Sequence, residues 1–100
     1  MMAKVRVIAR IQAHDGKALQ VRELMRRMLE PTRKEKGCEF YDLYEVSGTG
    51  LFYFDELWTS QEDLDAHAAS SHFQAIFGEA GPMLQAPPEV SLVTELHPLP

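Results

Sequence analysis

One hundred residues, of which 45% are hydrophobic and 25% charged, fit a single compact domain over residues 1–100. At this size about two-thirds of the unfolded surface can be buried, so we expect a thin core and a gain in stability from self-association. Fifteen acidic residues against ten basic ones give a net charge of −5, and this balance argues against nucleic-acid binding.

The first predicted element is a strand over residues 4–12, because apolar side chains recur there at every second position. A turn at residues 14–16 leads into an amphipathic helix over residues 17–36, whose apolar residues recur at intervals of three and four. Pro31 lies within this pattern, so we expect a kink there. Gly37 is expected to end the helix.

Two aromatic-rich strands, residues 38–46 and 51–59, follow the helix, and the loop SGTG between them predicts a hairpin. Pairing Val46 with Leu51 fixes the register. One face then carries the pairs Tyr41–Glu56 and Leu43–Phe54, and the other carries Phe40–Leu57, Asp42–Asp55 and Tyr44–Tyr53. Both faces hold large apolar side chains, so we expect both to be covered.

Ser60 and Asp63 resemble a capping box and predict the start of a helix with Leu64, His67 and Ala68 on one side.

A second short helix is expected from about Ser71 to Phe77, ended by Gly78 and the Gly81-Pro82 pair. The last predicted strand covers residues 89–96, where apolar residues alternate. The order βαββαβ predicts a ferredoxin-like α+β fold with an antiparallel sheet under helices on one side.

The predicted register sets Asp42 opposite Asp55 on the face away from the helices, where like charges destabilise a sheet. Arg6 and Arg10 should project to the same side, and we hypothesise that they neutralise the two aspartates. The apolar residues around them would be buried by a second subunit: Ile8, Phe40, Tyr44, Tyr53 and Leu57. The alternative is a solvated face with ordinary surface ion pairs.

Two of the four histidines lie five positions apart in the segment HAASSHF, residues 67–73. On one continuous helix five residues turn by about 500°, so the two rings would point about 140° apart. They would then not converge on one metal. A zinc-binding helix would prefer a four-residue interval and further ligands. We therefore predict no metal site.

His67 extends the apolar side of its helix and should point at the sheet. It is either a core histidine bonded to a carboxylate or carbonyl, or a base that deprotonates a bound phenol or hydroquinone. Glu56 could orient the ring, act as the base itself or join the sheet to a helix by an ion pair. His72 would close the edge of the pocket. The aromatic residues expected at such a cavity are Tyr41, Phe54, Trp58, Phe73 and Phe77.

The segments EPTRKEKGCEFYDLYE (30–45) and FYFDELWTSQEDLDAHAASSHFQAI (52–76) resemble the antibiotic biosynthesis monooxygenase family. This resemblance covers nearly the whole chain and implies a homodimeric α+β barrel. It also implies an oxygenase without a cofactor, which deprotonates a small electron-rich aromatic such as a quinol or anthrone and passes an electron to dioxygen.

Haem-degrading members of the family use an asparagine, a tryptophan and an iron-binding histidine. Ala9, His67 and Phe77 stand at those positions, so the resemblance does not extend to haem degradation. The sequence has no G-x-G-x-x-G segment and no phosphate loop, so no nucleotide cofactor is expected.

Two other functions remain open, a non-catalytic small-molecule-binding dimer and an isomerase of small oxygenated metabolites. The single cysteine, Cys38, is consistent with a reducing compartment, and no segment is apolar enough for a membrane span. We therefore expect a cytoplasmic protein without a membrane partner.

Overall fold

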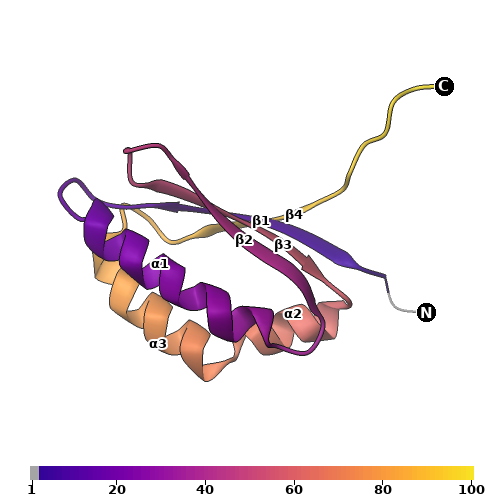
Figure 1. Ribbon diagram of the computed structural model, residues 1–100, viewed down its shortest axis with the longest axis horizontal. Helices are drawn as coiled ribbons and strands as arrows, with labels where there is room; N and C mark the ends of the chain where they lie inside the picture. The colour runs from indigo at the N-terminus through magenta and orange to yellow at the C-terminus, as the bar shows by residue number, and fades with distance from the viewer. Residues whose placement is uncertain (1–2) are drawn as a thin grey trace.

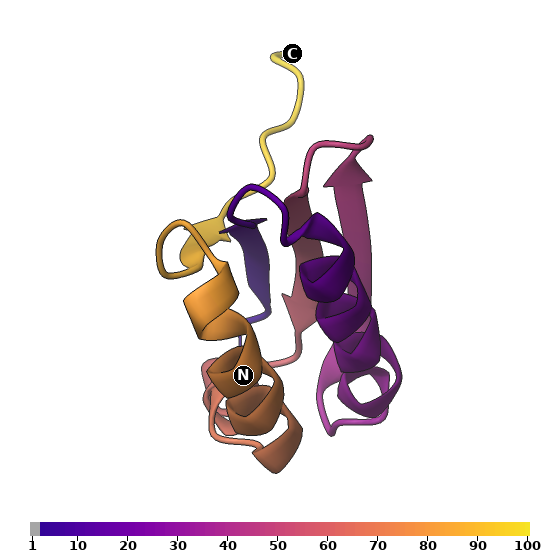
Figure 2. The same ribbon diagram turned by 90° about the vertical axis from the view of Figure 1, so that its left-hand side faces the viewer.

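The computed structural model describes residues 3–100 as one antiparallel sheet with its helices on a single face (Figures 1 and 2). The elements in chain order are β1 (Val5–Gln12), α1 (Ala18–Arg33), β2 (Cys38–Val46), β3 (Leu51–Trp58), α2 (Gln61–Ala68), α3 (Ser71–Ala80), the 3₁₀ turn η1 (Gly81–Met83) and β4 (Glu89–Val93). The strand order is β2-β3-β1-β4. The predicted ferredoxin-like α+β fold is confirmed, with α2 and α3 together in the place of the second helix.

The hairpin of β2 and β3 has the predicted register, with Val46 opposite Leu51 and Tyr41 opposite Glu56. The register shifts between Cys38 and Phe40, where the strand irregularity leaves one extra residue on β2. This register turns alternate side chains of the hairpin towards the helices and so builds one wall of the core.

The core lies between the sheet and the layer formed by α1 and α3, which run side by side (Figure 2). The strands contribute Val7, Ile11, Tyr41, Phe52, Phe54 and Trp58, and α1 contributes Val21, Leu24, Met25 and Met28. The period of three to four on α1 matches the residues that it buries. The predicted helix face is therefore the face that packs on the sheet.

Three predicted boundaries were wrong by three residues each. Helix α1 includes Pro31 but ends at Arg33, because the N–H groups of residues 34 and 35 bond to carbonyls three residues back and tighten the last turn. Helix α3 runs through Gly78 to Ala80, whose full burial holds the last turn against the core. Strand β4 ends at Val93, opposite Arg6, and in the same register residues 95 and 96 would lie beyond the start of β1 at Val5.

The glycine after α1 has a specific steric role. Gly37 has a φ of 81°, and a Cβ at this position would collide with the carboxylate of Asp63 at the start of α2. The side chain of Ser60 caps α2 by accepting from the Asp63 N–H at 3.2 Å, as the capping box predicted. Gly37 therefore lets the end of α1 approach the start of α2.

On the face away from the helices, the predicted charge pairing is half right. Arg6 binds Asp55 through both carboxylate oxygens, at 2.8 to 3.0 Å. Arg10 instead lies 3.9 Å from Glu89, its partner on β4, and Asp42 binds Arg33 at 3.1 Å. Arg10 lies on β1 and Asp42 on β2, and β3 separates these two strands in the sheet. The prediction that an arginine of β1 neutralises Asp42 was therefore wrong.

Within residues 3–100, none of the helices has both the length and the apolar composition needed to span a membrane.

Candidate functional site

A cavity of about 240 Å³ lies between the sheet and the helices α2 and α3. Four aromatic side chains line it, together with apolar residues of β1, α2, β4 and the segment before β4. Those aromatic residues are Tyr41, Phe54, Phe73 and Phe77. Its charged or titratable lining groups besides Tyr41 are Glu56, Asp65 and His67. A mostly apolar cavity with a few polar groups is the usual form of a small-molecule site.

His67 lies in the wall of this cavity and is only 3% exposed. Its ring stacks at a tilt on Trp58, with 4.7 Å between ring centroids, and meets Tyr41 and Phe73 edge to face. Its Nδ1 lies 2.6 Å from Oε2 of Glu35. Since Nδ1 is held by the carboxylate, Nε2 is the ring nitrogen left for a ligand in the cavity.

The prediction that the two histidines point apart was wrong. Oε2 of Glu35 lies 3.1 Å from Nε2 of His72, so both rings meet the same carboxylate oxygen. The single-helix geometry does not apply, because α2 ends at Ala68 and Ser70 caps a new helix. The chain bends at this break and brings the second ring back towards the first.

Glu35 is a site residue that the sequence analysis missed. It follows the end of α1, where its N–H bonds to the carbonyl of Thr32. Met28, Thr32 and Glu35 are spaced four and three residues apart, and the first two are fully buried. Continuing the buried face of α1 past its last turn would have directed Glu35 towards the core.

Glu35, His67 and His72 could hold a divalent metal, since one ligand atom from each lies within 4.8 Å of the others. Two imidazoles and one carboxylate are a ligand set found in zinc and non-haem iron sites. The same atoms already satisfy one another by hydrogen bonds, and across residues 3–100 no buried side-chain nitrogen or oxygen lacks a partner. We therefore assign no ion to this cluster.

Burial lowers the pKa of His67, and the hydrogen bond to Glu35 opposes this shift only in part. The imidazole is therefore neutral at pH 7, which is the form that can accept a proton. Burial also raises the pKa of the Tyr41 hydroxyl above its ordinary value, so this group stays protonated. Of these two cavity groups, only the histidine can act as a base near neutral pH.

Glu56 lines the cavity from β3 and accepts a hydrogen bond from the Trp58 indole Nε1 at 2.9 Å. Burial raises the pKa of Glu56 to about 7, and the indole hydrogen bond opposes this shift. Both protonation states are therefore populated near neutral pH. The carboxylate bonded to Nδ1 of His67 is Glu35, so of the alternatives for Glu56 the one in which it orients the ring was wrong.

Two residues expected at the cavity lie behind its wall. Trp58 is fully buried beneath His67 and does not line the cavity. His72 also lies outside the lining, with its Nε2 near the hydroxyls of Thr32 (3.2 Å) and Ser70 (3.4 Å).

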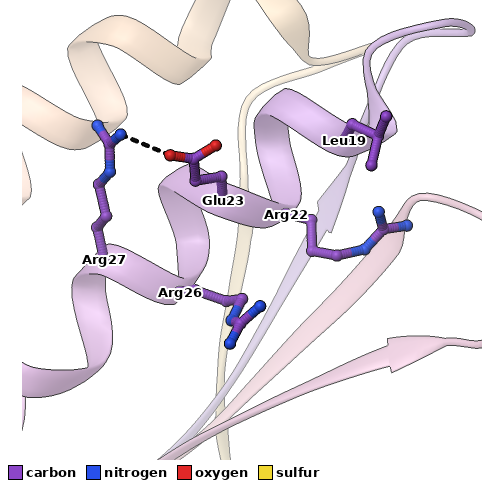
Figure 3. A pocket seen from close by; sticks show the side chains of 5 residues that line it. All are labelled: Leu19, Arg22, Glu23, Arg26 and Arg27. Atoms are coloured by element: carbon purple, nitrogen blue, oxygen red, sulfur yellow. Dashed lines mark hydrogen bonds and ion pairs between the residues drawn. The ribbon is translucent and has the colours of Figure 1, made fainter.

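A second hollow, of about 520 Å³, lies on the outer face of α1 and is lined by Leu19, Arg22, Glu23, Arg26 and Arg27 (Figure 3). All five belong to one helix, and Glu23 binds Arg27 at 2.7 Å across one turn. Arg22 is held by Glu45 of β2 at 2.6 Å. Despite its larger volume this hollow is an open surface between solvated side chains, so the aromatic cavity is the better candidate.

The comparisons with known proteins agree with the fold. The family model described as antibiotic biosynthesis monooxygenase matches residues 4–79. A candidate monooxygenase of Mycobacterium tuberculosis, Rv0793, is 34% identical over 96 residues, which are 96% of this chain and 95% of the relative. Its solved structure superposes with a TM-score of 0.86, at 33% identity, over 96% of this chain and 98% of that one.

The crystal structure of PA3566 from Pseudomonas aeruginosa matches with a TM-score of 0.87 and 28% identity, over 97% of this chain and 98% of that one. The family model alone covers well over half of the chain, and the mycobacterial relative extends the match to nearly all of it. The chain therefore belongs to the antibiotic biosynthesis monooxygenase family.

Proposed function

We propose that this protein is a cofactor-independent monooxygenase that oxidises a small electron-rich aromatic, of the quinol or anthrone type, with dioxygen. The observation that supports this most is a neutral, buried imidazole in the wall of an aromatic cavity, with Nδ1 engaged and Nε2 free for a ligand. Family membership supports the reaction class.

The size of the cavity favours a small planar ligand. Its volume of about 240 Å³ lies below the range of about 300–1,000 Å³ that is usual for drug-sized ligands. Aromatic side chains on both walls can stack on or edge-pack against a ring. A flat aromatic molecule therefore fits the cavity better than a flexible or strongly charged one.

His67 is the proposed base. Nε2 takes a proton from the substrate, and the resulting anion gives an electron to dioxygen in this mostly apolar cavity. Recombination of the radical pair forms the new C–O bond. For a CH₂ group that becomes C=O, one oxygen atom enters the product and the other leaves as water, so atoms and electrons balance without an external reductant.

Glu56 is the proposed acid. A carboxyl group with a pKa of about 7 is half protonated at neutral pH and can deliver a proton to the departing oxygen. Its position in the cavity lining allows it to reach a ligand there. Two titratable groups with pKa values shifted by different surroundings thus share one cavity.

We also propose that the protein is a homodimer in which the sheet face away from the helices is buried. Tyr44 is 59% exposed there, and Phe40, Tyr53 and Leu57 are only partly covered. The guanidinium of Arg6 lies over the Phe40 ring at 5.0 Å and binds Asp55, so its charge is already matched within the chain. An apolar patch with internally paired charges is suited to self-association.

Oxygen uptake tests the proposed reaction. Metal-free and flavin-free protein is mixed with a panel of hydroquinones and anthrones, and His67→Gln is compared with the wild type. Loss of the base should lower the rate by about 10²–10⁴-fold. The matched control is His97→Gln, because this side chain is 77% exposed and lies on the C-terminal segment.

The alternatives give different results in the same assay. A binding module would retain an aromatic ligand without consuming oxygen, and an isomerase would convert a substrate without uptake. Equal uptake by the wild type and His67→Gln would remove His67 from the mechanism.

A further inference from the structure

We propose that Glu35 and His72 are positioning residues for His67: His72 holds the Glu35 carboxylate, and the carboxylate fixes the ring so that Nε2 faces the cavity. This inference rests on the proposed role of His67 as the base. Neither Glu35 nor His72 lines the cavity, so both would act only through His67.

The direction of the hydrogen bonds follows from the carboxylate oxygen that the two rings share. Oε2 of Glu35 lies 2.6 Å from Nδ1 of His67 and 3.1 Å from Nε2 of His72. An ionised carboxylate can only accept hydrogen bonds, so each of these ring nitrogens must carry the proton. This assigns the Nδ1–H tautomer to His67 and leaves the lone pair on Nε2, the nitrogen a base needs.

The carboxylate also compensates the charge that proton transfer would create. An isolated imidazolium would be costly in a site where the ring is only 3% exposed. With Glu35 ionised, the cluster changes from one negative charge to neutral when His67 accepts a proton. The buried site therefore loses a charge during the proton transfer instead of gaining one.

His72 fixes the position of the Glu35 side chain, because its Nε2 lies 3.1 Å from Oε2 of Glu35. Glu35 lies after the last turn of α1, where no regular helix holds its side chain. His72 lies in the first turn of α3, with its Nε2 also close to the hydroxyl oxygens of Thr32 and Ser70. Ser70 caps α3 and donates its hydroxyl proton to the carbonyl of His67 at 2.7 Å. The break between α2 and α3 thus ties both rings and the carboxylate into one unit.

The variants separate hydrogen bonding from charge. His72→Ala removes the donor to Glu35, whereas His72→Gln can restore an N–H at nearly the same place. Glu35→Gln keeps an acceptor for Nδ1 but removes the charge. Gln74→Ala is the matched control, because it deletes another hydrogen bond across the same helix break, to the carbonyl of Ala68, without touching Glu35.

The first readout needs no turnover. Imidazole ¹⁵N chemical shifts should show His67 as the Nδ1–H tautomer in the wild type, in Gln74→Ala and in His72→Gln, and a mixture of tautomers in His72→Ala. A wild-type ring protonated at Nε2, or a single Nδ1–H tautomer that persists in His72→Ala, would overturn the inference. This result stands whether or not the protein proves to be an oxygenase.

The second readout is steady-state kinetics. We expect His72→Ala to lower kcat about tenfold with little change in KM, and His72→Gln to have a kcat close to that of the wild type. The kcat of Glu35→Gln should fall at least tenfold, although His67 keeps the Nδ1–H tautomer in this variant. If the kcat of His72→Gln fell as far as that of His72→Ala, or if neither substitution changed kcat, the positioning role would be wrong. Absence of oxygen uptake by the wild type would refute the proposed function and leave the tautomer measurement as the test of this inference.

Discussion

Glu56 and Trp58 lie two residues apart on β3, and the indole Nε1 of Trp58 donates to Oε1 of Glu56 at 2.9 Å within the buried layer under the helices. The hydrogen bond favours the ionised carboxylate, while burial favours the protonated form and is the larger effect. The pKa of Glu56 is therefore set by two opposed effects, burial and the hydrogen bond from Trp58.

Trp58→Phe should raise the pKa of Glu56 above about 7, because it deletes the donor that favours the carboxylate. The loss of a buried hydrogen bond should also cost about 1–3 kcal/mol of unfolding free energy. Carboxyl ¹³C chemical shifts followed through a pH titration, together with urea unfolding, would measure the two effects. A pKa that fell or stayed constant would show that the indole is not the relevant donor.

The stability of the protein should depend on Glu56 between pH 4.5 and about 7. The folded pKa is raised from 4.5 to about 7, so the folded state binds more protons than the unfolded state across this window. The stabilisation is present at low pH and is lost as pH rises through about 7, by up to ~3 kcal/mol.

Glu56→Gln cannot ionise and should therefore gain stability relative to the wild type as pH rises. Urea unfolding of both proteins from pH 5 to pH 8 would measure this difference, in which the contributions of other groups cancel. A difference that stays constant with pH would mean that the carboxylate is solvated in the folded state.

The rate should pass through a maximum below about pH 7 and fall on both sides of it. On the acidic side His67 becomes protonated, and because its pKa is lowered this loss should occur below the usual histidine value of 6.5. On the alkaline side Glu56 loses its proton near pH 7. The pH profile of kcat/KM for the wild type should thus be bell-shaped.

Glu56→Gln should remove the alkaline limb and keep the acidic one. An alkaline limb that is unchanged in this variant would show that another group is the acid.

Zinc should inhibit the protein. A zinc ion bound by Glu35, His67 and His72 would displace the proton from Nδ1 of His67 and leave the neutral ring protonated at Nε2, which could then no longer act as a base. We expect inhibition by excess Zn²⁺, reversal by a chelator, and weaker inhibition in His72→Gln. Activation by added metal would contradict the base mechanism and favour a metal-dependent reaction.

The sheet face away from the helices should control oligomeric state. Leu57→Asp places a charge in the proposed interface and should shift a dimer towards monomer in multi-angle light scattering. The control is Leu19→Asp, since Leu19 is 74% exposed on the outer face of α1. A wild-type monomer, or a dimer equally affected by both substitutions, would contradict the proposed interface.

The fold and the hairpin could be predicted because local patterns determine them. The period-2 strands and the SGTG loop fix which residues of β2 and β3 meet. The structure has the predicted pairs from Phe40–Leu57 to Val46–Leu51. The aromatic lining followed from the same alternation, since it places Tyr41 and Phe54 under the helices. Trp58 shares that side but is covered by His67, and burial depth of this kind is a tertiary property.

The polar cluster could not be predicted from spacing alone. Its geometry depends on the end of α1, the break at Ser70 and the packing of α3 beside α1, and these bring residue 35 to residues 67 and 72. The Ser70 cap was the local signal of the break, and two helices were indeed expected there. Treating the two histidines as if they shared one helix gave the wrong directions for their rings.

The central claim, that His67 removes a proton from an aromatic ligand, is tested most directly without oxygen. Under anaerobic conditions an electron-rich hydroquinone or anthrone is mixed with the protein at neutral pH, and the absorbance band of its anion is recorded. We predict that the wild type and His97→Gln produce the bound anion and that His67→Gln does not. An anion band of equal intensity with His67→Gln would contradict the account.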